Sequence, residues 1–263
     1  GKAIGGGIPT GTFGMTHEMA AEIAAKVDRE VVDTGGIGGT LAGNALSLAS
    51  MRATLTQVLT AANFEKMIAL GTRWSDGVDA AIKEFNIDVR GHICLDVGAS
   101  TGGFTQVLLE NGAEGVVAVD VGHDQLVDLL KSDDRVVSLE GCNLRDLTVE
   151  KLQHLSNRRF DFSYVVADLS FISLTLVLEQ LAALAPKAPM VLLVKPQFEV
   201  GKHSLNASGI VTDWRDRRRA LEQVIDSAAK LGYEISGLVE SSIKGTHGNT
   251  EYLLWISPTG VDN

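Results

Sequence analysis

The most chemically informative stretch of the sequence is a glycine-rich turn between an apolar run and a helical pattern. Residues 93–97 predict a buried strand, and residues 105–109 begin an amphipathic helix. Between them, Gly98, Gly102 and Gly103 let the backbone bend sharply and approach a ligand closely. In doubly wound α/β proteins this turn lies where nucleotide-like ligands bind. Asp96 stands before the turn, so the pattern differs from the dinucleotide fingerprint G-x-G-x-x-G.

A second acid fits the same chemistry. Asp120 ends the apolar run 116–119, 24 residues after Asp96. A carboxylate at the end of the second strand can accept hydrogen bonds from both ribose hydroxyls of a nucleoside. Two plainer alternatives are that Asp120 caps the next helix and that the glycine turn holds no cofactor. Together, turn and acid favour a nucleoside-containing ligand.

The elements that must position these residues follow an alternating pattern from residue 88 onward. Strands are predicted at 92–97, 115–120, 135–138, 163–168, 189–194, 234–239 and 250–257, and helices at 103–111, 123–131, 148–155, 174–185 and 215–231. This alternation predicts an α/β fold, Rossmann-like, with a parallel sheet covered by helices on both faces. No helix separates the last two strands, so we expect residues 251–257 to insert antiparallel.

Residues 1–86 have a different pattern. They are rich in glycine, and helices are predicted at 17–25, 44–59 and 63–85 with no strand between them. We therefore predict two domains, a mostly helical segment at 1–86 and an α/β domain at 87–263. The N-terminal helices are a candidate contact for a homodimer.

Composition and charge restrict the class of protein. The chain has 263 residues and a formal net charge of −10, which opposes a strong nucleic-acid binder. Of this charge, −2 falls on residues 1–86 and −8 on the remainder. The two cysteines, Cys94 and Cys142, form no metal-binding spacing and suit a cytoplasmic protein, so no metal is expected. No apolar run reaches the length of about 18 residues that a membrane span needs, so no membrane partner is expected.

The turn and the sheet resemble a known class of enzyme. The pattern D-x-G-x-x-x-G-G-F-T from Asp96 to Thr105 is similar to the S-adenosylmethionine loop of class I methyltransferases, whose seven-stranded sheet ends as predicted here. The resemblance implies S-adenosyl-L-methionine as the cofactor. The residues expected to bind it are Asp96, Gly98, Ala99, Ser100, Thr101, Gly102, Gly103, Phe104, Asp120 and Asn143.

From residue 87 to 254 the chain resembles the TlyA-type family, which includes 2′-O-ribose methyltransferases of ribosomal RNA and whose members often carry the name haemolysin. The motifs that carry the resemblance are the turn itself, the run 165–173 (VVADLSFIS), the run 194–199 (VKPQFE), and the two short segments 243–245 and 248–251. The family resembles FtsJ-like enzymes, which use a Lys-Asp-Lys-Glu tetrad. Asp168, Lys195 and Glu251 match its last three positions and are the expected catalytic residues; an ion pair that only stabilises the sheet edge is the alternative for Asp168 and Lys195.

The chain also departs from this family. The first tetrad lysine falls on Gly77, and Lys83 projects some 120° away on a helix. The family's N-terminal RNA-binding module of the S4 type is replaced by other sequence. The resemblance thus implies ribosomal RNA as a partner, with activity reduced by both losses.

Residues 1–86 resemble class III pyridoxal-phosphate aminotransferases of the glutamate-semialdehyde aminomutase type. The runs Gly1–Gly7 and Gly39–Asn44 carry this resemblance. Lys2 matches the family's Schiff-base lysine and Thr40 its phosphate-binding threonine. The acid that must hold the pyridine nitrogen protonated is missing, so we do not expect productive binding of pyridoxal phosphate.

The sequence therefore predicts a fusion of two truncated families. Its leading function is methylation of ribosomal RNA with S-adenosylmethionine. The alternatives are a non-catalytic module that binds S-adenosylmethionine or RNA, a remnant of a pyridoxal-phosphate enzyme, and an unrelated activity acquired by the fusion.

Overall fold

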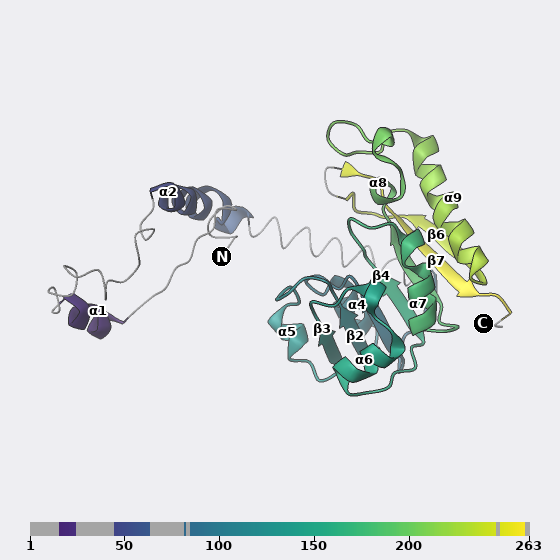
Figure 1. Cartoon of the computed structure of the whole chain (residues 1–263), viewed down its shortest axis with the longest axis horizontal. Helices are drawn as coiled ribbons and strands as arrows, with labels where there is room; N and C mark the ends of the chain where they lie inside the picture. The colour runs from purple at the N-terminus through teal and green to yellow at the C-terminus, as the bar shows by residue number, and fades with distance from the viewer. Residues whose placement is uncertain (1–15, 25–44, 64–81, 83–84, 246–247, 261–263) are drawn as a thin grey trace. The chain divides into compact units, whose positions relative to one another are not determined.

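The computed structural model describes residues 16–24, 45–63, 82, 85–245 and 248–260 (Figure 1). The chain divides into two compact units, residues 1–70 and 71–263. In the first unit, α1 spans His17–Ala24, and α2 at Ala45–Ala53 continues into a π-helical turn, η2, at Thr54–Val58. These elements agree with the first two helices predicted from the sequence. Lys2, Thr40, Gly77 and Lys83 lie outside the described residues, as does most of the third predicted helix.

The second unit is built on a seven-stranded sheet in the order β3-β2-β1-β4-β5-β7-β6. Its strands are β1 (Ile93–Val97), β2 (Gly115–Val119), β3 (Val136–Leu139), β4 (Tyr164–Ala167), β5 (Met190–Val194), β6 (Tyr233–Glu240) and β7 (Tyr252–Pro258). The first five strands pair in parallel, whereas β7 pairs antiparallel with both β5 and β6. The predicted antiparallel insertion is confirmed, and the order is that of class I S-adenosylmethionine methyltransferases.

Helices cover both faces of this sheet (Figure 1). They are α4 (Gly103–Glu110), α5 (Asp128–Lys131), α6 (Val149–Ser156), α7 (Leu178–Leu184), α8 (Pro196–Glu199) and α9 (Trp214–Lys230), with short 3₁₀ turns η3 (Leu144–Asp146), η4 (Leu174–Leu176) and η5 (Lys202–Ser204). Side chains from α6, α7 and α9 pack with one face, and those from α4 and α5 with the other. Ile82 and Phe85 add to the α4 face, so residues before the domain boundary predicted from the sequence contribute to this core.

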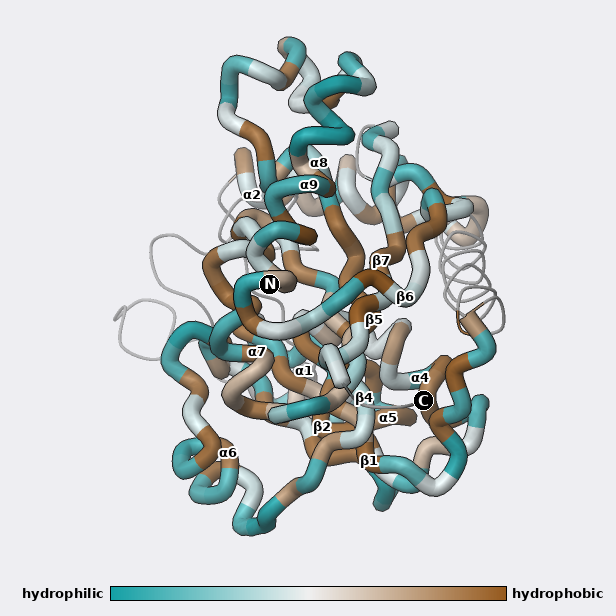
Figure 2. The backbone as a smooth tube through the Cα atoms, turned by 90° about the vertical axis from the view of Figure 1, so that its right-hand side faces the viewer, coloured by the Kyte–Doolittle hydropathy of each residue, from teal (hydrophilic) through white to brown (hydrophobic). Residues whose placement is uncertain are grey.

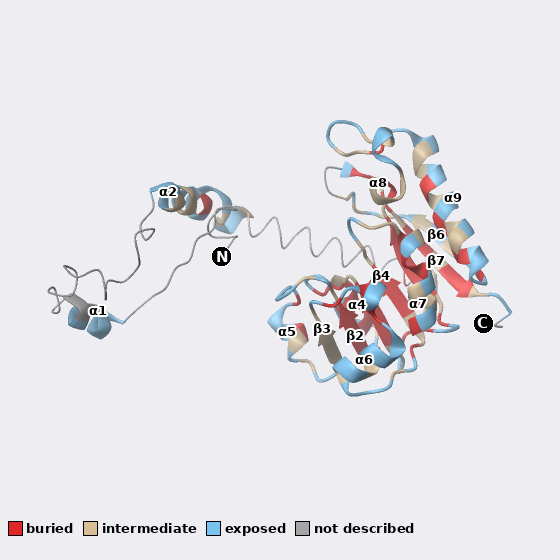
Figure 3. Ribbon diagram, in the orientation of Figure 1, coloured by how far each residue is buried: buried red, intermediate tan, exposed pale blue. Residues whose placement is uncertain are grey.

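The strands hold the core because their side chains are apolar on both faces. Leu95 and Val97 belong to one apolar cluster and Cys94 to the other, as the alternation along a strand requires. In Figure 2 the brown of hydrophobic residues marks β1, β2 and β4, and in Figure 3 the red of buried residues marks the central strands of the sheet. The carboxyl ends of β1, β2 and β4 therefore emerge together from a rigid base.

Two predicted helices are corrected by the structure. The helix expected at 123–131 is only the four-residue α5, because the amides of Asp124, Gln125 and Leu126 bind a carboxylate instead of continuing a helix. The helix expected at 174–185 is divided at Val177 into η4 and α7.

Candidate functional site

A cavity of about 530 Å³ opens at the carboxyl ends of β1, β2 and β4. Its volume lies in the range of about 300–1,000 Å³ that small-molecule sites occupy. Acidic and apolar side chains share its wall, which is lined by Val97, Gly98, Ser100, Val119, Asp120, Val121, Gly122, Gln125, Cys142, Asn143, Leu144, Arg145, Asp168, Leu169, Ser170, Phe171, Ile172 and Val177. This is the edge at which open α/β sheets bind ligands.

The glycine-rich turn forms one part of the wall. Gly98 has a φ of +81°, and a Cβ at this position would stand 2.2 Å from the backbone oxygen of Asp168. Its N–H donates to the carbonyl of Val119 at 2.8 Å. The close approach of the turn to the ends of β2 and β4 therefore requires glycine at this position.

Asp120 directly follows β2, contacts the turn, and already accepts two hydrogen bonds. Ser100 N donates to one carboxylate oxygen at 2.8 Å and Gly122 N to the other at 2.6 Å. Each carboxylate oxygen has a second lone pair, so Asp120 retains acceptor capacity on the cavity wall. Asp120 is thus fixed in place by backbone amides and can still accept from a ligand.

Asp96 is fully buried behind the turn and does not line the cavity. The Thr105 hydroxyl donates to its Oδ2 at 2.6 Å, while Oδ1 has no hydrogen-bond partner among the described residues. Burial raises the pKa of Asp96 to about 7, against the hydrogen bond from Thr105, which lowers it, and with a further rise from the negative charge of Asp168. Asp96 therefore carries a proton under mildly acidic conditions.

Another part of the cavity wall is the segment that follows β3, residues 142–145. Cys142 N donates to the carbonyl of Asp120 at 2.8 Å, which ties the segment after β3 to the end of β2. Asn143 caps η3 by accepting from Arg145 N at 3.0 Å. The buried side chains of Cys142 and Leu144 give this wall an apolar surface suited to a flat ring.

An ion pair stands at the rim of the cavity. Lys195 Nζ, at the end of β5, lies 2.5 Å from Asp168 Oδ1, at the end of the adjacent β4. The two side chains are only 11% and 19% exposed. The Nζ also donates to the hydroxyl of Ser170 at 2.9 Å. Two contacts therefore fix the Lys195 amine, and Asp168 belongs to both the ion pair and the cavity.

Glu251 approaches this pair from the segment before β7. Its carboxylate is buried, and Oε1 accepts from Gln197 Nε2 at 2.8 Å. Burial raises the pKa of Glu251, while the Gln197 hydrogen bond and the positive charge of Lys195 lower it. Gly245 leaves the space that this carboxylate fills, since a Cβ there would overlap Glu251 Oε1.

The segment from Lys195 through α8 connects the parts of the site. Glu199 accepts from the Ser173 hydroxyl at 2.5 Å and from Leu174 N at 2.9 Å. Phe198 packs against Phe171, with ring centroids 5.1 Å apart. Phe171 itself has a φ of +65° and is 90% exposed at the rim of the cavity. The segments after β4 and β5 therefore hold each other at the carboxyl edge of the sheet.

The structure brings together part of the predicted site. Gly98, Ser100, Asp120 and Asn143 line the cavity. Asp168, Lys195 and Glu251 form one electrostatic group, of which Asp168 also lines the cavity. The remaining residues of the predicted cofactor set do not line the cavity; Ala99, Thr101, Gly102 and Gly103 form the backbone of the turn, and Phe104 is buried in the core. Their contact with a cofactor remains a prediction.

Sequence reasoning missed several residues of the wall and of its support. Gln125 and Leu144 line the cavity, and Gln197 holds Glu251. Gln197 lies within the run VKPQFE, one of the motifs that carry the family resemblance, so this motif could have indicated a role for Gln197. Glu140, which binds the backbone of residues 124–126, had no such signal because its partners are 14 to 16 residues away.

Two further properties concern metals and membranes. Among the described residues, no three His, Cys, Asp or Glu side chains gather in a way that could hold a metal ion. No helix in the described part of the chain is long and apolar enough to cross a membrane.

Comparison with known proteins gives the family. Residues 78–257 match the family described as FtsJ-like methyltransferase. The 16S/23S rRNA (cytidine-2′-O)-methyltransferase TlyA of Mycobacterium tuberculosis is 49% identical over 177 residues, 67% of this chain and 64% of that protein. This chain therefore spans just under two thirds of that relative's length. A crystal structure described as a hemolysin from Lactococcus lactis is 39% identical with a TM-score of 0.67, covering 72% of this chain and 88% of that one.

A weaker, partial similarity involves a different family. Glutamate-1-semialdehyde 2,1-aminomutase 2 of Halalkalibacterium halodurans is 38% identical over 106 residues, which are 40% of this chain and 22% of that protein. Both resemblances inferred from the sequence are thus confirmed. The methyltransferase match covers more than half of the chain, and the fold and family imply S-adenosylmethionine as the cofactor. The chain belongs to the FtsJ-like methyltransferase family.

Proposed function

We propose that this protein methylates the 2′-hydroxyl of a ribose in ribosomal RNA, with S-adenosylmethionine as the methyl donor. The observation that carries the proposal is the Asp168–Lys195 ion pair at the rim of the cavity. Asp168 both lines the cavity proposed for the cofactor and pairs with the amine of Lys195. The name of the TlyA relative, which specifies ribosomal RNA and a cytidine 2′-oxygen, supports the substrate class.

The cavity fits the proposed cofactor. Gly98 allows the backbone to approach closely, and Asp120 offers acceptors for a ribose. Cys142 and Leu144 provide an apolar wall for the base. When bound, S-adenosylmethionine supplies an electrophilic methyl group on a positively charged sulfur.

The ion pair supplies the acid–base chemistry that a ribose hydroxyl needs. A hydroxyl is a weak nucleophile, and a positioned amine that accepts its proton accelerates the attack. Lys195 would accept the proton of the 2′-hydroxyl, and bound S-adenosylmethionine would supply the methyl group that this oxygen receives. Asp168 and Ser170 hold the Lys195 amine in place before and after this transfer. Glu251, held by Gln197, adds a third charged group to the site.

The experiment measures methyl transfer from labelled S-adenosylmethionine to ribosomal subunits and to free ribosomal RNA. Lys195→Ala should lower the rate by about 10²- to 10⁴-fold, the usual contribution of a general base. Its affinity for S-adenosylhomocysteine should stay close to that of the parent. Lys230→Ala, at the exposed end of α9, is the matched control and should keep full activity.

Asp120→Ala should give the opposite pattern. Loss of the carboxylate that accepts from the ribose should weaken cofactor binding by about 1–3 kcal/mol.

Undiminished transfer by Lys195→Ala would overturn the assignment of the base. Cofactor binding by the parent without transfer to any ribosomal RNA would favour the non-catalytic alternative. Methyl transfer by the parent that is slower than that of a family member with the first tetrad lysine would agree with the glycine that this chain has at position 77.

A further inference from the structure

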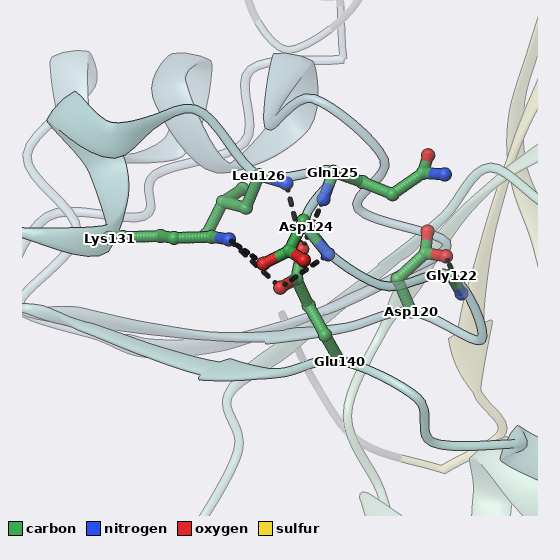
Figure 4. Close-up of polar contacts among 7 residues, drawn as sticks. All are labelled: Asp120, Gly122, Asp124, Gln125, Leu126, Lys131 and Glu140. Atoms are coloured by element: carbon green, nitrogen blue, oxygen red, sulfur yellow. Dashed lines mark hydrogen bonds and ion pairs between the residues drawn. The ribbon is translucent and has the colours of Figure 1, made fainter. Parts of the chain in front are cut away.

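One half-buried carboxylate outside the predicted site binds three successive backbone amides. Glu140 follows β3, and its Oε1 accepts from Gln125 N at 2.6 Å and Leu126 N at 2.9 Å. Its Oε2 accepts from Asp124 N at 3.1 Å and lies 2.9 Å from Lys131 Nζ. Figure 4 shows the three amide nitrogens turned toward the carboxylate, with Lys131 approaching from the other side.

The backbone of the loop is shaped for this contact. Asp124 has a φ of +53°, the left-handed conformation that turns successive N–H groups toward one point. Such a concave arrangement of amides binds an anion, and here the anion is a side chain of the same domain. The hydrogen bond from Leu126 and the others from Lys131 and Gln125 hold the pKa of Glu140 at about 2, so its charge is permanent at neutral pH.

The loop that Glu140 holds is a wall of the cavity. Gly122 and Gln125 line it, and Gly122 N donates to Asp120, the acid placed at the cofactor ribose. Gly122 is in turn tied to the strand segment beside Glu140, since Gly141 N donates to its carbonyl at 2.7 Å. Two carboxylates thus fix the loop that follows β2. Asp120 accepts from the amide of Gly122, and Glu140 accepts from the amides of residues 124–126.

The same loop supports the glycine-rich turn from behind. Val127 N donates to the carbonyl of Thr101 at 3.3 Å. Leu126 and Leu130 pack so tightly on Gly102 that a Cβ there would stand 2.8 and 2.2 Å from their methyl groups. Displacement of residues 124–126 would therefore move two walls of the cavity together.

We propose that Glu140 is a positioning residue for the cofactor, which sets the affinity for S-adenosylmethionine by fixing residues 122–126 and, through them, the glycine-rich turn. This inference rests on the proposed placement of the cofactor in the cavity. Glu140 touches neither the cofactor nor the Asp168–Lys195 pair in this scheme, so it acts on binding and not on methyl transfer itself.

The test is calorimetric titration of the full-length chain with S-adenosylhomocysteine, which reports the Kd and the fraction of competent molecules separately. Glu140→Gln replaces a charged acceptor by an amide that cannot accept from all three N–H groups. We expect its Kd to rise about tenfold or more with the competent fraction unchanged, since the charge-assisted contacts are lost. Glu140→Asp keeps the charge on a shorter side chain and should give a smaller rise; if Glu140→Gln does not fold, this variant decides the question by the same criteria.

Two matched controls separate positioning from a general loss of charge. Asp133→Asn removes a carboxylate beside β3 that pairs with Arg135 and does not line the cavity, and it should leave the Kd unchanged. Lys131→Met removes the ion pairs with Glu140 and with the exposed Asp124 but leaves all three amide contacts to Glu140, so the Kd should change by less than about threefold.

The outcomes are distinguishable. A parent-like Kd in the Glu140 variants, with or without a loss of competent molecules, would overturn the inference and leave Glu140 a structural residue only. Absence of binding by the parent chain would overturn the cofactor placement and this inference with it. Parent binding together with a raised Kd in Glu140→Gln, a smaller rise in Glu140→Asp and a parent-like Kd in Asp133→Asn would support both.

Discussion

At the scale of single residues, the ionisation of Asp96 opposes folding. Its pKa is about 7 in the folded protein, chiefly because of burial, against an ordinary value of 3.8. Between these values the unfolded chain releases the proton while the folded protein keeps it, so stability falls as pH rises from about 4 to 7. Below this window the carboxyl is protonated in both states, and above it the loss is complete.

Asp96→Asn should remove this dependence. An amide keeps an acceptor for the Thr105 hydroxyl and carries no charge. We expect the free energy of unfolding of the variant, relative to the parent, to increase with pH across the window by up to about 4 kcal/mol, at about 1.4 kcal/mol per pKa unit. Urea unfolding at pH 4, 5, 6, 7 and 8 measures it. A difference that is constant across this range would contradict the pKa of Asp96.

Individual residues also show how far the sequence could predict the site. Asp120, Asp168 and Lys195 could be found because each ends an apolar run, and strand ends meet at one edge of a parallel sheet. Glu140 also follows a strand, yet its role depends on the left-handed backbone of Asp124, which local sequence does not reveal. The sequence therefore could not predict that Glu140 holds the cavity wall, although it did predict Asp120 as an acid of that wall.

At the scale of elements, the turn between β1 and α4 depends on glycine for two separate reasons. Gly98 has a positive φ, and its missing Cβ leaves room for the backbone oxygen of Asp168. Gly91, before β1, also has a positive φ but has no atom near its missing Cβ. The two positions therefore separate the cost of the backbone conformation from the cost of crowding.

Alanine substitutions at these two glycines should differ in stability. Gly91→Ala should lower the free energy of unfolding by about 1–2 kcal/mol, the cost of a left-handed non-glycine residue. Gly98→Ala should lower it by roughly 3 kcal/mol or more, since overpacking adds to that cost, and it should also weaken binding of S-adenosylhomocysteine. Denaturant unfolding and calorimetry measure both quantities. Equal losses at the two positions would show that the contact between Gly98 and Asp168 is unimportant.

Elements were predictable where their own residues decide them. The buried strands β1, β2, β4 and β5 follow from their apolar runs, and α9 follows from its long amphipathic pattern. The helix predicted at 123–131 was wrong because Glu140, a distant carboxylate, binds the backbone amides before α5. The helix predicted at 174–185 is interrupted at Val177, whose φ of −129° is not helical. The four-residue α8 was missed because so short a helix shows no periodicity.

At the scale of the whole molecule, the methyltransferase unit contains everything that lines the cavity. The lining residues run from Val97 to Val177, and the family match covers 78–257. The unit that begins at Gly71 also includes Ile82, which is buried, and Phe85, whose ring lies 5.5 Å from that of Trp255. The boundary inferred from the sequence, at residues 86–87, would separate these two side chains from the sheet they cover.

Two truncated chains test where the functional unit begins. A fragment of residues 71–263 should bind S-adenosylhomocysteine with a Kd within about twofold of the full chain, because it keeps both the cavity and its supporting core. A fragment of residues 87–263 keeps the cavity but loses Ile82 and Phe85, and the space left beside Trp255 and Gly237 should lower its free energy of unfolding by roughly 2–5 kcal/mol relative to the longer fragment. Urea unfolding of both fragments, with calorimetric binding as the check on function, measures the difference. Equal stability would place the start of the domain at residue 87, whereas loss of binding by a folded 71–263 fragment would show that the N-terminal unit takes part in the cofactor site.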